Sequence, residues 1–80
     1  MSIVDTSSLE TNGDTMYERL SNLVDEHGEV MVRFDSGAEH ELHRHNVQFL
    51  DEPMVKVVTP DAVYWFDAER IESYWIHYEY

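Results

Sequence analysis

Residues 62–80 read AVYWFDAERIESYWIHYEY, and this aromatic segment organises the rest of the chain. It follows a Thr-Pro-Asp turn signal, and its aromatic and β-branched residues favour strands. We predict two strands, Ala62–Phe66 and Ile71–Glu79, joined by one tight helical turn at Asp67–Arg70. Alternation along the last strand places apolar and aromatic side chains on both of its faces. One face can join a core, so the other needs a second explanation.

The second face of that strand predicts self-association. Ile71, Trp75 and His77 share one face, and the tyrosines share the other. A contiguous apolar patch beside a sheet edge is rarely exposed by soluble monomers. Tyrosine suits a partly hydrated interface, because its ring buries area while its hydroxyl reaches water. We therefore predict a homo-oligomer, most simply a two-fold dimer, whose interface consists of Tyr74, Ile76, Tyr78 and Tyr80.

Length and composition indicate one small domain. A chain of 80 residues buries only about 60% of its unfolded surface, and this one has no cysteine for a disulfide or a thiolate metal site. Residues 1–14 are polar and without periodicity, which predicts a flexible N-terminal arm before a single α+β domain at residues 15–80. The arm has no basic start and no apolar block, and no apolar run approaches the roughly 20 residues of a membrane span. We expect a cytoplasmic protein that does not enter the membrane.

The charge balance is extreme. Seventeen acidic residues stand against one lysine and four arginines, giving a formal charge of −12. Self-repulsion at this density opposes compaction at low salt and is screened at high salt. The composition resembles that of proteins from salt-accumulating halophilic archaea. An ordinary acidic protein and an acidic mimic of nucleic acid are the alternatives. The acids are scattered along the chain, which favours a solvated surface over a single binding tail.

The segment after the arm predicts a helix. Residues 15–18 form a capping box, in which the Thr15 hydroxyl and the Glu18 carboxylate satisfy the first backbone N–H groups. His27 and Gly28 provide a favourable helix end and a left-handed cap. Between them, apolar residues recur at helical spacing and form one stripe: Met16, Leu20, Leu23 and Val24.

Everything after the helix predicts antiparallel strands joined by short turns. Glu29–Phe34 alternates, and Asp35-Ser36-Gly37 is a hairpin turn. Residues 39–50 are predicted as one long strand, or as two joined by a bend near His45-Asn46. Residues 54–59 are predicted as the next strand, running in the opposite direction. Because short turns favour neighbouring strands, we expect one N-terminal helix followed by a five-stranded antiparallel meander. This α+β fold is either an open sheet or a small SH3-like or Sm-like barrel.

Two segments carry a resemblance to the Sm-like and SH3-like small barrels. Residues 33–37, Arg-Phe-Asp-Ser-Gly, are similar to the strand and Asp-Gly turn of the Sm motif, and residues 49–54 are similar to its later Phe-Asp-x-x-Met-Asn segment. The resemblance implies a bent five-stranded barrel and RNA binding. However, Val55 stands at the place of the RNA-contacting Asn, and Asp67-Ala68-Glu69 replaces the family's basic-Gly pair.

Two further sets of residues are candidate sites. A fold could bring Arg33, Arg44 and Lys56 together for nucleic acid, although a charge of −12 repels phosphates. His43 and His45 point to one face of a strand with Glu41, a possible set of zinc or nickel ligands. We favour the alternative that these histidines pair with nearby carboxylates, since no metal motif surrounds them.

Catalytic motifs are not evident in the sequence. The glycines form no phosphate loop, and no serine lies in a nucleophile elbow. We predict a non-enzymatic, acidic binding or adaptor domain without a cofactor that binds itself and possibly another protein. An Sm-like RNA-binding protein is the alternative, and a metal-dependent enzyme ranks third.

Overall fold

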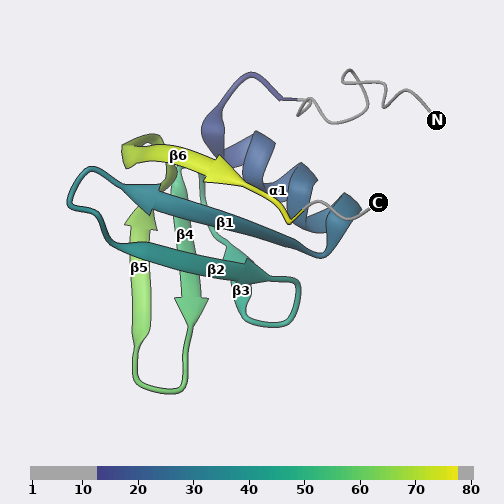
Figure 1. Cartoon of the computed structure of the whole chain (residues 1–80). Coiled ribbons are helices and arrows are strands. Elements are labelled where there is room, and N and C mark those ends of the chain that lie inside the picture. Colours follow the sequence, from purple (N-terminus) through teal and green to yellow (C-terminus); the bar gives the residue numbers. More distant parts are fainter. Residues whose placement is uncertain (1–12, 78–80) are drawn as a thin grey trace, which may run out of the picture.

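The computed structural model describes residues 13–77, which contain one α-helix and six strands (Figure 1). Residues 1–12 of the predicted arm lie outside the described residues. The α+β class is confirmed. Among residues 13–77, no helix is long and apolar enough to cross a membrane. In chain order the elements are α1 (Met16–His27), β1 (Glu29–Phe34), β2 (Glu39–His43), β3 (Val47–Phe49), β4 (Met54–Val58), β5 (Val63–Asp67), the 3-10 turn η2 (Ala68–Arg70) and β6 (Ile71–Trp75).

Helix α1 begins and ends where its capping residues predict. The Thr15 hydroxyl accepts a hydrogen bond from the Glu18 N–H at 3.2 Å. Gly28 adopts the left-handed conformation with φ of 83° and donates its N–H to the Val24 carbonyl at 2.8 Å, which is the glycine cap that ends many helices. The predicted apolar stripe is confirmed, because Leu20, Leu23 and Val24 are buried and Met16 packs against them.

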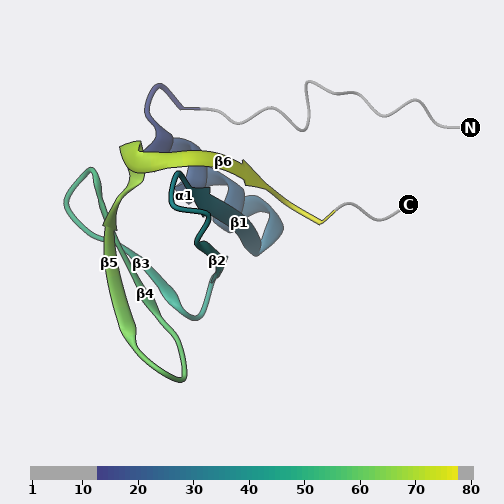
Figure 2. The same cartoon turned by 60° about the vertical axis from the view of Figure 1, so that its left-hand side comes forward.

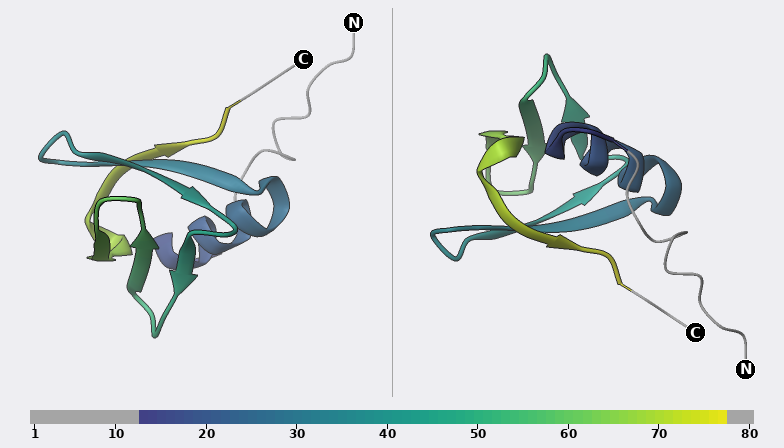
Figure 3. Two further views of the ribbon diagram at one scale, coloured as in Figure 1. Left: turned by 90° about the horizontal axis from the view of Figure 1, so that it is seen from below. Right: turned by 90° about the horizontal axis from the view of Figure 1, so that it is seen from above.

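The strands form two three-stranded antiparallel sheets rather than the single five-stranded meander that we predicted. Sheet A has the order β2-β1-β6, and sheet B has the order β3-β4-β5. The two sheets cross steeply, with α1 packed behind sheet A (Figures 1 and 3). The meander prediction is wrong in its pairing: β2 and β3 belong to different sheets, and the last strand pairs with β1 instead of β5.

The division of the long strand is set by Asn46. Its side-chain Oδ1 accepts from the His43 N–H at 2.7 Å, and its own N–H donates to the His43 carbonyl at 3.0 Å. Its carbonyl accepts from the Val58 N–H at 2.8 Å. These bonds end β2, turn the chain and attach the turn to β4 of the other sheet. The predicted bend near His45-Asn46 is therefore confirmed as a break between two strands.

The turn η2 carries the chain from sheet B back to sheet A. The Asp67 carboxylate caps it by accepting from the Glu69 N–H at 2.8 Å, as an N-cap residue does. The chain then runs antiparallel to β1, with a register shift between Arg33 and Phe34. The predicted helical turn is confirmed at Ala68–Arg70. The final strand ends at Trp75, earlier than predicted, and residues 78–80 lie outside the described residues.

One apolar core joins the helix to both sheets. Every second residue of β1 and β4 points into it, as strand alternation requires. The described strands pair only within their own sheet, so the structure is open and not a closed barrel. The buried residues of this core are Leu20, Leu23, Val24, Val30, Val32, Leu42, Val55, Val57, Ala68 and Ile71.

Candidate binding surfaces

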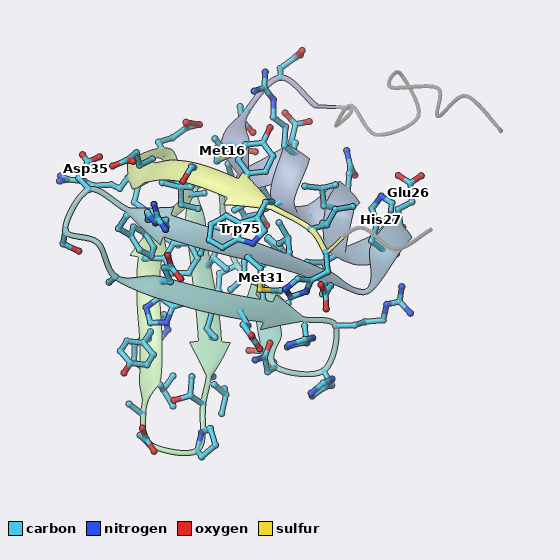
Figure 4. All side chains as sticks on the ribbon, viewed as in Figure 1. Met16, Glu26, His27, Met31, Asp35 and Trp75 are labelled. Atoms are coloured by element: carbon cyan, nitrogen blue, oxygen red, sulfur yellow. The ribbon has the colours of Figure 1, made fainter. Side chains whose placement is uncertain are left out.

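The outer face of sheet A, which points away from α1, is covered by its own side chains. Met31 is only 4% exposed although it points away from the shared core, where Val30 and Val32 lie. Trp75 is the cross-strand partner of Met31 and lies across this face beside it (Figure 4). Trp75 itself remains 37% exposed, with the Arg33 guanidinium 5.8 Å from its ring centroid. A small second apolar cluster therefore occupies the outside of sheet A.

Ion pairs surround this cluster. Arg33 donates from Nε to the Glu39 carboxylate at 2.8 Å on the neighbouring strand. At the other end of β1, Nδ1 of His77 lies 2.7 Å from Glu29 Oε2. The hydrogen bond from the His77 side chain lowers the pKa of the Glu29 carboxyl, and the His77 and His43 charges act in the same direction. These pairs are exposed, so each contributes little to stability.

The outer face of sheet B has the same kind of residues without the cover. Lys56 and Trp65 are cross-strand partners on β4 and β5, on the side opposite Val55 and Val57. The ammonium group of Lys56 lies 5.8 Å from the Trp65 ring centroid. Trp65 is nevertheless 58% exposed, the largest value among the exposed hydrophobic residues that the structure describes. Further large apolar residues are exposed on the same hairpin: Val58, Val63 and Tyr64.

The residues predicted to form the self-association face lie differently. Tyr74 and Ile76 are half-buried and pack against the shared core. Tyr78 and Tyr80 lie outside the described residues. The exposed apolar residue of β6 is Trp75, on the opposite face. Alternation showed correctly that both faces of this strand are apolar, but it did not show which face joins the core.

The three cations considered for nucleic acid have separate surroundings. Arg33 lies on β1 of sheet A and pairs with Glu39, whereas Lys56 lies on β4 of sheet B beside Trp65. Arg44 donates to the Asp25 carbonyl at 2.7 Å and so caps the end of α1, where a positive charge opposes the helix dipole. The two strand cations each accompany an exposed tryptophan instead of forming one common basic patch.

The histidines considered as metal ligands lie close together. The rings of His43 and His45 are stacked with centroids 5.5 Å apart, and His43 Nε2 lies 3.2 Å from Glu41 Oε2. Within residues 13–77, no group of three or more His, Cys, Asp or Glu side chains is arranged to hold a metal ion. The arrangement is that of a histidine paired with a carboxylate on an exposed strand.

A shallow pocket of about 270 Å³ lies between the end of α1 and the residues after β6. It is lined by His27, Glu29, Ile76 and His77. Its Glu29–His77 pair orients the imidazole, and the lining contains no serine, threonine, cysteine or lysine. The absence of enzymatic activity stays a prediction.

The exposed Trp65–Lys56 pair was not predicted as a site, because composition alone does not separate the exposed from the buried aromatic residues of this segment. The available signal was positional: Trp65 follows a turn and alternates with Tyr64 and Phe66, so it must face away from them. No family model, curated protein or solved structure matches this chain.

Proposed function

We propose that this chain is a non-enzymatic binding or adaptor domain that associates with copies of itself. The observation that supports this most strongly is the exposed apolar surface of the β4–β5 hairpin, centred on Trp65. Trp65 has 58% of its surface exposed and lies next to exposed valines. An exposed apolar group of this kind usually belongs to an interaction surface. A small domain also gains stability by burying such a surface against a partner.

We propose further that the domain belongs with the Sm-like and SH3-like small barrels in architecture. The order of elements supports this: a helix, a hairpin, three further strands and one helical turn before the last strand. The pairing of β6 with β1 also supports it, since the last strand of a barrel must return to the first. The sheets are not closed, so the likeness concerns topology.

The working environment that we propose is a salt-rich cytoplasm. The support is the charge of −12 with one lysine, spread over the whole chain. Screening shortens the range of repulsion to about 3 Å at 1 M salt. We expect the melting temperature to rise steeply between low salt and concentrations above about 1 M, measured by circular dichroism. A melting temperature that is flat or falls over this range would contradict the halophilic assignment.

Self-association is tested by measuring molar mass in molar salt, where repulsion cannot hide it. We expect sedimentation at tens of micromolar protein to give a multiple of the 9.5 kDa chain mass. Trp65→Gln should weaken the assembly while leaving the circular dichroism spectrum unchanged. Ile76→Glu with Tyr78→Glu tests the predicted C-terminal interface instead, and because Ile76 packs against the core, circular dichroism must first show that this variant is folded. A monomeric wild type would end the proposal.

Binding to single-stranded RNA is the second candidate function. It is favoured by the two exposed tryptophans, each with a cation 5.8 Å from its ring, because bases stack on such aromatic side chains. The overall charge of −12 opposes it. Quenching of tryptophan fluorescence by short ribo-oligonucleotides in molar salt would support RNA binding. The same titration with Trp65→Gln shows whether the exposed hairpin is responsible.

A further inference from the structure

Strand β5 has a free edge, and we propose that it pairs antiparallel with β5 of a second copy, so that two sheets B join into one six-stranded sheet. This inference rests on the self-association proposed above and specifies its surface. It is argued from the four edge strands of the two sheets, from the charge of the β4–β5 hairpin and from the position of that hairpin.

The four edge strands differ in how well they are protected against pairing. Edges are normally blunted by charge, by short length or by bulges. Strand β2 carries two glutamates and two histidines, and β3 has only three residues. Strand β6 carries Glu72 and pairs with β1 through a register shift. Strand β5 is the least protected of the four edges: its one charge is Asp67 at the last position, where the carboxylate caps η2, while Val63-Tyr64-Trp65-Phe66 has no charge or proline and keeps a continuous register with β4.

The charge of this hairpin identifies a second copy as a suitable partner. Residues 54–67 contain one lysine and two aspartates, Lys56, Asp61 and Asp67, and carry a net charge of only −1, whereas the whole chain carries −12. Two copies repel each other wherever their acidic surfaces meet, so this nearly neutral hairpin is where they can approach closely. A second copy also offers an equally unprotected edge, and each edge leaves backbone groups that the other can satisfy.

The position of the hairpin leaves room for the partner. The turn between β4 and β5 extends away from α1, and both strands of the hairpin project beyond sheet A (Figures 1 and 2). Val63 and Trp65 are exposed in the first half of β5, the Tyr64 ring between them lies 4.6 Å from the His40 ring of β2, and Phe66 and Asp67 are more buried. A second β5 can therefore lie alongside without contact with the helix.

Symmetry gives the proposal a sharp consequence. Directly opposite residues in an antiparallel ladder point to the same face of the sheet. A two-fold axis perpendicular to the joined sheet keeps each face unchanged, so one residue of β5 must lie opposite its own copy. Opposite Cβ atoms are about 4.5–5.5 Å apart, close enough for a cross-link after small adjustments.

The first test changes the edge by adding a charge. Val63→Lys places on β5 the residue that protects natural edges, and it reduces the negative charge, so electrostatics alone would strengthen association. We expect instead at least about a tenfold rise in the dimer dissociation constant in molar salt. The control, Gln48→Lys, makes the same charge change on β3 at the opposite edge of sheet B and should leave the constant unchanged.

The second test exploits the absence of cysteine from the chain. Single cysteines replace Val63, Tyr64 or Trp65, and the proteins are oxidised in molar salt. We expect one of the three to form a covalent dimer efficiently, and Gln48→Cys to form none. A wild type that is monomeric overturns both this inference and the proposed function. A wild type that assembles, while Val63→Lys assembles equally well or no β5 cysteine cross-links, overturns the edge pairing alone.

Discussion

The outer faces of the two sheets each carry a tryptophan opposite a residue of the central strand, and yet the two faces differ in how far they are covered. In sheet A, Trp75 lies beside Met31 of the central strand and covers it, so that Met31 is only 4% exposed. In sheet B, Trp65 lies beside Lys56 of the central strand and stays 58% exposed. The difference lies in the residue of the central strand. A tryptophan packs closely on an apolar neighbour because both then lose contact with water, whereas beside a lysine it stays more exposed because the ammonium group must remain hydrated. A single position thus separates a self-covered face from one available to a partner.

The largest effect is expected from exchanging these central residues. Met31→Lys would bury an ammonium group beneath Trp75, next to Glu41, its exposed cross-strand partner on β2. Because one ion pair offsets only part of the cost of burying a charge, we expect a loss of unfolding free energy of about 3 kcal/mol. The reciprocal variant, Lys56→Met, should change stability by no more than about 0.5 kcal/mol, because its site is on the surface. Urea unfolding in molar salt measures both. Equal losses in the two variants would show that the faces do not differ in this way.

The fold could be predicted where the signals are local. The capping residues Thr15 and Gly28 defined the helix, and Gly37 defined the hairpin turn after β1, where it adopts φ of 92°. The pairing of β6 with β1 could not be predicted from them. It joins segments about 40 residues apart, as in the pair Phe34 and Ile71, and such contacts depend on tertiary packing.

The candidate surfaces were harder to predict because alternation assigns residues to a face without showing which face is buried. Tyr74 and Ile76, which we predicted at an interface, are half-buried and pack against the core, and their place at an interface stays a prediction. The choice is made by η2 and by the register shift beside Arg33, which together fix how β6 enters sheet A. Neither feature has a signature in the spacing of apolar residues.

A smaller effect is expected from truncating the two tryptophans. Trp75→Ala removes the cover of Met31, and because Trp75 is 37% exposed we expect a loss of about 1–3 kcal/mol, less than for a fully buried aromatic residue. Trp65→Ala should change the stability of the monomer by no more than about 0.5 kcal/mol. Unfolding must be measured at protein concentrations below those of any assembly. A larger loss for Trp65→Ala than for Trp75→Ala would reverse the assignment of the two faces.

The smallest effect concerns the ion pair at the end of the covered face, where His77 holds Glu29. The hydrogen bond from the His77 side chain lowers the pKa of Glu29 below its ordinary value of 4.5. A carboxyl whose pKa is lower in the folded than in the unfolded state stabilises the fold above its unfolded pKa, and this contribution is lost as pH falls through the folded value. Glu29→Gln removes the contribution, so the variant should melt slightly below the wild type at neutral pH.

The difference should then shrink below pH 4.5 and vanish once Glu29 of the folded wild type is protonated. Loss of one negative charge also relieves general repulsion, which acts in the opposite direction. Glu72→Gln is the matched control, because Glu72 is exposed on β6 and makes none of the ion pairs described above. Both variants change the net charge equally, so the difference between their melting temperatures isolates the contact with His77. If the difference between the two melting temperatures stayed constant from neutral to acid pH, Glu29 would not be stabilised by the contact with His77.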